Sequence, residues 1–196
     1  MSNRAVTMDE VLDLVAYEKE RPAIRAKMME MKRPRRIAVG EHLTFLFENH
    51  DTVLYQVHEM MRAERMVHDE AIQHELDTYN GLLPSSPGAL AVVLLVEYAT
   101  AEEREEHLPN LLTLNEHLEI QVGDRPPVSP RWDAMQVGDT RISSVQYLQF
   151  LDVAPDEDAI TAFREGPVVL RSTHPYLPAE TVLNDVSRAA LADDMA

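Results

Sequence analysis

TVLYQVHEMMRAERMVHDEAIQHELDTY, residues 52–79, is the stretch that decides the predicted fold, because it has the periodicity of one long amphipathic helix. Asp51 or Thr52 can cap its start, and Asn80-Gly81 can supply a left-handed exit. At about 100° per residue its apolar side chains fall on one broad stripe. The pattern therefore predicts a central helix packed against the core. The stripe consists of Val53, Leu54, Val57, Met60, Met61, Val67, Ala71, Ile72 and Tyr79.

Three ionisable residues, Glu64, His68 and Glu75, fall near the middle of that stripe. Buried ionisable groups are costly unless they are paired, hydrogen-bonded or bound to a metal. Glu64 and His68 are four residues apart, a spacing with which one helix can give two ligands to a metal. One hypothesis is therefore a site for iron, manganese or zinc, and its further donors would be His42, Glu48 or His50.

The alternatives to a metal site are a salt-bridged or hydrogen-bonded buried cluster, or an edge of the stripe that faces solvent. We favour these alternatives, because two carboxylates and one imidazole fall short of a carboxylate-bridged metal site without a paired motif on another helix.

Composition restricts the function further. The chain of 196 residues has a formal charge of −16 at pH 7, which argues against nucleic acid as a partner. The acidic excess lies in residues 66–196, which carry 7 Lys/Arg and 23 Asp/Glu. The absence of cysteine excludes disulfides and thiolate-held iron–sulfur clusters. The longest apolar run, Ala89–Val96, is far shorter than a membrane span, so we expect a soluble, cytoplasmic protein with no membrane partner.

The N-terminal region is predicted to contain two helices and a hairpin. A capping box at Thr7 and Glu10 precedes a short helix to about Lys19, and Pro22 suits the first turn of a second helix that ends near Met31. Residues 37–48 alternate as two strands around a turn at Gly40.

Residues 89–172 have the element order strand, helix, strand, strand, helix, strand, which is typical of a ferredoxin-like βαββαβ unit with one antiparallel sheet. A strand at 181–183 and a helix capped by Asp185 follow. The predicted fold class is therefore α+β, with N-terminal helices, a β-hairpin and a long central helix before the ferredoxin-like unit. We expect residues 1–81 and 82–196 to pack as one compact unit. The six elements are 89–98, a helix capped by Thr100 and ended or kinked by Pro109, 117–122, 145–153, 155–166 and 168–172.

Several segments resemble the bacterial and archaeal family catalogued as domain of unknown function 3501. They are RRIAVGEHLTFLFE at 35–48, YQVHEMMRAER at 55–65, LDTYNGLLP at 76–84, VQYLQF at 145–150 and THPYL at 173–177. The family has no established activity, but its members are often encoded beside rubrerythrin-like proteins and iron–sulfur or flavin oxidoreductases. The resemblance therefore implies a redox setting. Gln56, Glu59, Arg62 and Glu64 lie within the matching motif, whereas His68 and His74 do not.

Gln56, Glu59 and Arg62 form a second candidate site on the side of the helix away from the stripe. They indicate either an exposed ion pair or an anion or partner site, since an Arg side chain can hold a carboxylate or phosphate with two hydrogen bonds. The basic run that includes Arg35 and Arg36 is either a solvated or internally paired surface or an anion-binding site. For this run we favour a solvated or internally paired surface over anion binding.

The third candidate is the connection at 123–142, which shows no periodicity and carries Arg125, Arg131 and Trp132. Such a loop can contact a partner, or it can fold back so that Trp132 fills a gap in the surface. The sequence contains no glycine-rich phosphate loop, nucleophile elbow or zinc helix. The leading hypothesis is a non-catalytic accessory or binding protein that works with a redox protein partner. The alternative is a metal-binding protein or metal-dependent enzyme.

Overall fold

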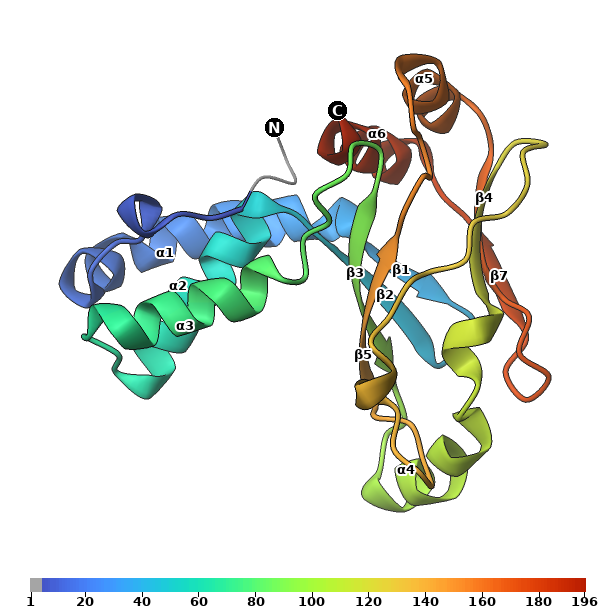
Figure 1. Cartoon of the computed structure of the whole chain (residues 1–196), viewed down its shortest axis with the longest axis horizontal. Coiled ribbons are helices and arrows are strands. Elements are labelled where there is room, and N and C mark those ends of the chain that lie inside the picture. The colour runs from blue at the N-terminus through green and yellow to red at the C-terminus, as the bar shows by residue number, and fades with distance from the viewer. Residues whose placement is uncertain (1–4) are drawn as a thin grey trace.

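The computed structural model describes residues 5–196 and places the helices of the N-terminal half together on one side of the strands (Figure 1). These helices are the short 3₁₀ helix η1 (Met8–Glu10), α1 (Leu14–Lys32), α2 (His50–Glu64) and α3 (Asp69–Asn80). We call residues 6–13 the strap, and the strap with α1–α3 the helical layer. No helix within residues 5–196 is both long and apolar enough to cross a membrane.

Helix α1 is one helix, so the predicted break before Pro22 is wrong. Asp13 caps its start by accepting from the backbone N–H groups of Val15 and Ala16, and the predicted capping box of Thr7 belongs to η1 instead. Tyr17 and Met28, which lie on either side of Pro22, are both buried. Packing on both sides of Pro22 therefore offsets the backbone hydrogen bond that proline removes.

The predicted central helix is also wrong, because it is divided into α2 and α3. Arg65 takes the left-handed conformation (φ 54°) and ends α2, and His68 is the N-cap residue of α3. Asn49 caps α2 in a capping box with Thr52, and Gly81 is right-handed rather than the predicted left-handed exit. The apolar residues of both helices fit one helical pattern because the two buried faces belong to the same small cluster. This cluster contains Val53, Val57, Met61, Ile72 and Leu76.

The strands form two antiparallel sheets. The first has the order β1 (Arg36–Val39), β2 (Leu43–Glu48), β3 (Leu90–Val96), β5 (Val145–Phe150). The second has the order β4 (Leu118–Val122), β6 (Val168–Ser172), β7 (Ala179–Val182).

This topology confirms the α+β class and the predicted hairpin β1–β2, whose turn includes Gly40 at φ 65°. The predicted ferredoxin-like arrangement is wrong for two reasons. Strand β2 of the hairpin pairs with β3, and β4 pairs with β6 in a separate sheet.

The two sheets face each other and are linked at both edges. On one side the segment 128–131 runs between them, since Val128 pairs with Ile120 of β4 and Arg131 pairs with Gln149 of β5. On the other side the Thr181 hydroxyl donates to the Ala38 carbonyl at 2.8 Å and joins β7 to β1. The result is a partly closed β-sandwich.

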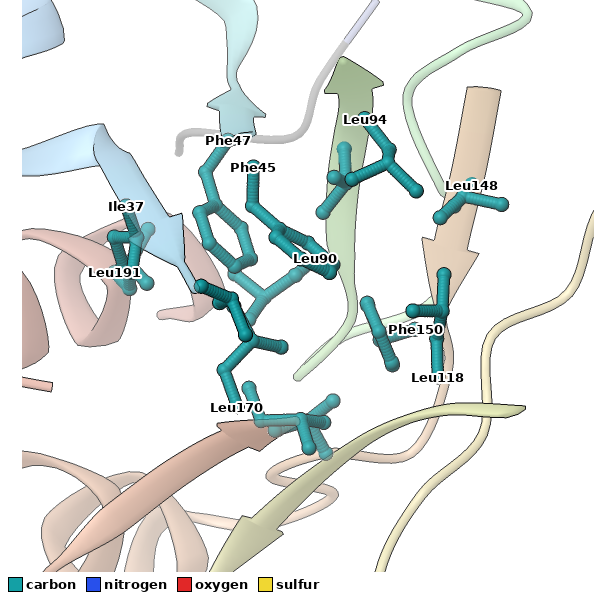
Figure 2. Packing of buried hydrophobic residues seen from close by; sticks show 14 of the residues in the cluster. Ile37, Phe45, Phe47, Leu90, Leu94, Leu118, Leu148, Phe150, Leu170 and Leu191 are labelled. Carbon is teal, nitrogen blue, oxygen red and sulfur yellow. The ribbon is translucent and has the colours of Figure 1, made fainter. Parts of the chain in front are cut away.

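The main core lies inside this β-sandwich. Figure 2 shows Phe45, Phe47 and Phe150 of the first sheet near Leu118 and Leu170 of the second. Helices α5 (Glu157–Glu165) and α6 (Asp185–Met195) cover one end of the β-sandwich (Figure 1). Helix α4 (Ala101–His107) covers the other end with the short 3₁₀ helices η3 (Leu108–Leu111) and η4 (Leu114–His117), and another, η5 (Ala134–Gln136), lies in the 123–142 connection.

Candidate functional site

Glu59 is the centre of a polar cluster between α1 and α2. The Tyr17 hydroxyl donates to Glu59 Oε1 at 2.5 Å, and Arg21 donates through Nε and Nη2 to the two carboxylate oxygens at 2.7 and 2.8 Å. Both side chains come from the inward face of α1, whose residues 14, 17, 21, 24, 28 and 31 alternate in spacings of three and four. The cluster therefore joins the two helices through one two-point ion pair and one hydroxyl.

The electrostatics of this cluster favour an ionised Glu59. The Arg21 hydrogen bonds, aided by the Tyr17 hydroxyl, lower the pKa of Glu59 to about 2, although partial burial acts in the other direction. Burial, followed by the hydrogen bond to Glu59, raises the pKa of Tyr17. Since both carboxylate oxygens already accept hydrogen bonds, Glu59 has the geometry of a structural ion pair rather than of a general base.

The side chains of Gln56, Glu59 and Arg62, which the sequence grouped as one candidate site, have different partners in the structure. Arg62 pairs with Glu18 of α1 at 2.6 Å rather than with Glu59. Gln56 lies close to Tyr79 of α3, where burial raises the pKa of the Tyr79 hydroxyl and the Gln56 side chain acts in the other direction. The three side chains therefore contact different partners, and Arg62 does not present a free two-point site for an anion.

His58 lies beside the Glu59 cluster and is only 3% exposed. Its ring stacks on Tyr17, with centroids 4.7 Å apart, and its Nε2 accepts the Leu12 N–H at 2.8 Å. Burial lowers the pKa of His58, which favours the neutral ring that this hydrogen bond requires. His58 therefore holds the strap on α2.

Two further contacts hold the strap in place. Asn80 of α3 exchanges two hydrogen bonds with the Val6 backbone, at 2.7 and 2.9 Å. His50 Nε2 lies 3.2 Å from Glu10 Oε1. Between the strap, α1 and α2 lies an apolar pocket of about 310 Å³, which we call the helix pocket. His58 and Tyr55 contribute to its lining.

The basic run pairs within the chain, as the internally paired alternative predicts. Arg35 is buried and binds Asp194 of α6 through two hydrogen bonds at 2.6 and 2.9 Å. Arg36 pairs with Glu97 at the surface at 3.2 Å. Neighbouring Lys32 and Arg33 pair with Glu48 and Glu30.

Glu64 and His68 are exposed and Glu75 is half-buried, so the premise that the three lie within a buried stripe is wrong. The physical reason is the turn at Arg65, which ends α2 and changes the direction of the chain between Glu64 and His68. The suggested further donors are placed elsewhere: His42 bonds to the Glu97 carbonyl, Glu48 lies near Lys32, and His50 lies near Glu10. Across residues 5–196 there is no group of three such donors arranged to hold one metal ion.

The connection at 123–142 lies along the open edge of β5. The Gln136 side chain accepts from Tyr147 N–H at 2.7 Å and donates to Tyr147 O at 2.9 Å, as a neighbouring strand would. Trp132 is partly buried against the main core, in agreement with the gap-filling alternative. Beside this edge is a groove of about 710 Å³, which we call the β5 groove. Its lining includes Thr78, Leu82, Arg131, Trp132, Gln136 and Tyr147.

Tyr17, Arg21 and His58 were not among the predicted site residues. The three-and-four spacing of residues 14–31 was a signal that Tyr17 and Arg21 share the inward face of α1. No comparable local signal identified His58, because its partner Leu12 is 46 residues away in the sequence.

Comparison with known proteins identifies the family of this chain and one solved structure that is similar over almost the whole chain. The chain belongs to the family described as "Protein of unknown function (DUF3501)", which it matches over residues 5–195. A crystal structure of a "novel protein of unknown function" from Burkholderia pseudomallei K96243 is similar at a TM-score of 0.88 and 29% identity. The alignment covers 98% of this chain and 100% of that one. A search of curated proteins gave no match.

Proposed function

We propose that this chain is a non-catalytic accessory protein of the cytoplasm that docks on a partner protein through the β5 groove. The observation that carries the proposal is the composition of the groove. Tyr147 is 44% exposed, Trp132 and Arg131 line the wall, and the adjoining Met135 is 89% exposed. Tyr, Trp, Arg and Met are the residue types enriched at the centres of protein interfaces.

The charges in and around the groove indicate what kind of surface it accepts. Arg131 has no ion-pair partner among the described residues, so its guanidinium is available to a carboxylate of the partner. Over longer range the formal charge of −16 attracts a partner with a basic surface. We therefore expect the partner to insert an apolar side chain into the groove and to place a carboxylate near Arg131. Basic side chains of the partner would surround this contact.

The resemblance of the sequence to its family supports a redox enzyme as the partner. A titration of the purified chain against a rubrerythrin-like protein, and against an iron–sulfur or flavin oxidoreductase from the same cell, tests this directly. We expect 1:1 binding that weakens as salt is raised, because part of the attraction is electrostatic.

Tyr147→Ala provides the specific variant and Tyr176→Ala the matched control, since both tyrosines are 44% exposed but only Tyr147 lines the groove. We expect Tyr147→Ala to weaken binding by about tenfold or more, as removal of a central aromatic does. Tyr176→Ala should bind as the unmodified chain does. Equal binding by both variants would contradict the groove as the docking site.

A further inference from the structure

Strand β5 is the last strand of the first sheet, and the backbone groups on its outer edge are paired with substitutes for a further strand. At Gln149 the substitute is backbone. The Arg131 N–H donates to the Gln149 carbonyl at 2.7 Å, and the Gln149 N–H donates to the Arg131 carbonyl at 2.9 Å. This mutual exchange is the hydrogen-bonded pair of an antiparallel ladder. The chain therefore begins to add an antiparallel strand to β5, but the pairing ends after one bridge.

The next residue with its backbone groups on this edge, Tyr147, is paired with a side chain instead. Gln136 Oε1 accepts the Tyr147 N–H at 2.7 Å, and Gln136 Nε2 donates to the Tyr147 carbonyl at 2.9 Å. One primary amide thus makes the two hydrogen bonds that one residue of an antiparallel strand makes. The position beside Tyr147 therefore has the geometry that an extended peptide backbone requires.

Val145 is two residues from Tyr147, so its backbone groups lie on the same edge. Its N–H donates to the Ser143 hydroxyl at 3.2 Å, at the long end of the range for hydrogen bonds. Its carbonyl accepts from Gln146 Nε2 at 3.0 Å and has a second lone pair. These contacts are local, so an added strand can continue from Tyr147 to Val145.

The segment that carries Gln136 has little buried surface. Residues 133–135 are exposed and Gln136 is half-buried. On either side the chain is anchored, by the backbone pair of Arg131 and by a bridge between Val137 and Ile142. Contacts of exposed segments open at a low free-energy cost. The Gln136 side chain can therefore rotate away from β5 while both anchors stay in place.

From these observations we propose that the partner protein docks by adding an antiparallel strand to β5, and that this strand displaces the Gln136 side chain from Tyr147. The proposal rests on docking at the β5 groove and names the kind of contact made there. The exchange conserves hydrogen bonds, because the incoming backbone replaces both bonds that Gln136 gives up. Alternate side chains of a strand point to one face, so one of them reaches the groove, which Tyr147 and Gln136 line. Gln136 then caps an edge that would otherwise be a template for pairing.

Hydrogen exchange of the free chain tests the cap. Gln136→Ala should raise the exchange rate of the Tyr147 amide by about tenfold, because the variant lacks the acceptor. Gln121→Ala is the matched control, since Gln121 is also half-buried and donates to a backbone carbonyl, that of Arg125, at 3.1 Å. It should leave the Tyr147 amide unchanged. An equally slow Tyr147 amide in Gln136→Ala would overturn the role of Gln136.

Titration against the rubrerythrin-like protein tests strand addition. Binding by the unmodified chain includes the cost of displacing Gln136, so Gln136→Ala should bind about fivefold more tightly. Gln121→Ala should bind as the unmodified chain does. In the complex the Tyr147 amide should exchange at least about tenfold more slowly than in free Gln136→Ala, because a carbonyl of the partner accepts it. If Gln136→Ala does not fold, Gln136→Met keeps the length of the side chain without its amide and replaces it in both experiments.

The outcomes distinguish this inference from the docking proposal. Absence of binding by the unmodified chain and by every variant would refute docking, and strand addition with it. Binding that Tyr147→Ala weakens and that Gln136→Ala also weakens, or a Tyr147 amide that exchanges freely in the complex, would keep the groove as the docking site but overturn strand addition. Self-association of Gln136→Ala without the partner, with a protected Tyr147 amide, would assign the edge to a second copy of this chain and overturn the partner's strand as its occupant.

Discussion

The helical layer and the β-sandwich are held together by different kinds of contact. The β-sandwich has one large apolar core between its two sheets, with Phe45, Phe150 and Phe163 fully buried. The helical layer has a much smaller cluster around Val57 and Met61, and relies in addition on hydrogen bonds and ion pairs. Stability of the first region therefore follows apolar area, whereas stability of the second depends also on charge.

The difference between the regions also determines where the chain can respond to its surroundings. Apolar burial changes little with pH or salt, but a partly hydrated ion pair such as Arg21–Glu59 and a buried imidazole such as His58 change with pH. The strap and the helix pocket lie in the pH-dependent region. Variants in each region can test this contrast.

The largest effect is expected in the core of the β-sandwich. Phe45→Ala should lower the free energy of unfolding by about 3–5 kcal/mol, because it leaves a cavity beside the central strand. Met61→Ala, in the smaller cluster, should cost about 2 kcal/mol. Denaturant titration followed by circular dichroism measures both. A greater loss for Met61→Ala than for Phe45→Ala would contradict the proposed difference between the two cores.

The next effect concerns the contact between the regions. Asp194 of α6 binds the buried Arg35 and accepts from the side chain of Asn49, the N-cap residue of α2. Asp194→Ala leaves a guanidinium without its carboxylate and should cost about 3 kcal/mol.

Asp193→Ala is the matched control, since Asp193 is 68% exposed and pairs with Arg164 at the surface. It should cost less than about 1 kcal/mol. The double variant Arg35→Met with Asp194→Leu should recover much of the lost stability, because it replaces the buried pair by apolar side chains. Equal unfolding midpoints for the two aspartate variants would show that the buried pair adds no more than the surface pair.

The sequence predicted those parts of the fold for which local pattern is sufficient. Alternation in residues 37–48 identified the hairpin, and the aliphatic segment at 89–98 was correctly predicted as a strand, β3. The break between α2 and α3 was missed because Arg65 takes the left-handed conformation without a glycine or proline to signal it. Val67 had been counted in the apolar stripe, but it is 66% exposed in the resulting turn.

Contacts between distant segments explain the other differences. The order of elements in 89–172 did not show that the earlier hairpin occupies the edge of β3, and nothing periodic in 123–142 predicted that 128–131 links the sheets. Glu59 was identified as a candidate, but its partners Tyr17 and Arg21 precede it by 42 and 38 residues. Local spacing on α2 could relate Glu59 only to its neighbours on that helix.

A smaller effect is expected at Glu59. Glu59→Gln removes the charge from the α1–α2 contact and should cost about 1.5–2 kcal/mol at pH 7. Glu18→Gln, which affects the more exposed pair with Arg62, is the control and should cost less than about 0.5 kcal/mol.

The dependence on acid has a defined sign. The pKa of Glu59 is lowered from 4.5 to about 2 in the folded chain. The contribution of Glu59 to the free energy of unfolding is therefore complete above pH 4.5, the pKa of this residue in the unfolded chain. The contribution is lost as the pH falls from about 4.5 towards 2. Thermal unfolding at pH 7 and pH 3 should therefore show a smaller difference between Glu59→Gln and the unmodified chain at pH 3. An unchanged difference would contradict the ion pair.

The smallest effect concerns two buried histidines, one in each region. Burial lowers the pKa of His58 in the helical layer and, together with nearby His117, that of His174 in the β-sandwich. The unfolded chain takes up protons at these residues below about pH 6.5, whereas the folded chain resists protonation. The stabilisation that depends on the two neutral histidines should therefore be complete above that pH, and it should decrease as the pH falls below it.

Each histidine accepts a backbone N–H that reports on it separately. Leu12 donates to His58 Nε2 and Tyr176 donates to His174 Nδ1, so protonation at either acceptor atom removes that hydrogen bond. We expect the hydrogen-exchange protection factor of Leu12 to fall between pH 7.5 and 5.5, and His58→Gln to reduce the pH dependence of the unfolding temperature. The Tyr176 protection factor should fall less, because the His174 ring is held at its other nitrogen by the Thr113 hydroxyl, 3.2 Å from Nε2, which opposes local opening. Equal losses at both amides, or stability that rises with acid, would contradict a pH response centred on the strap.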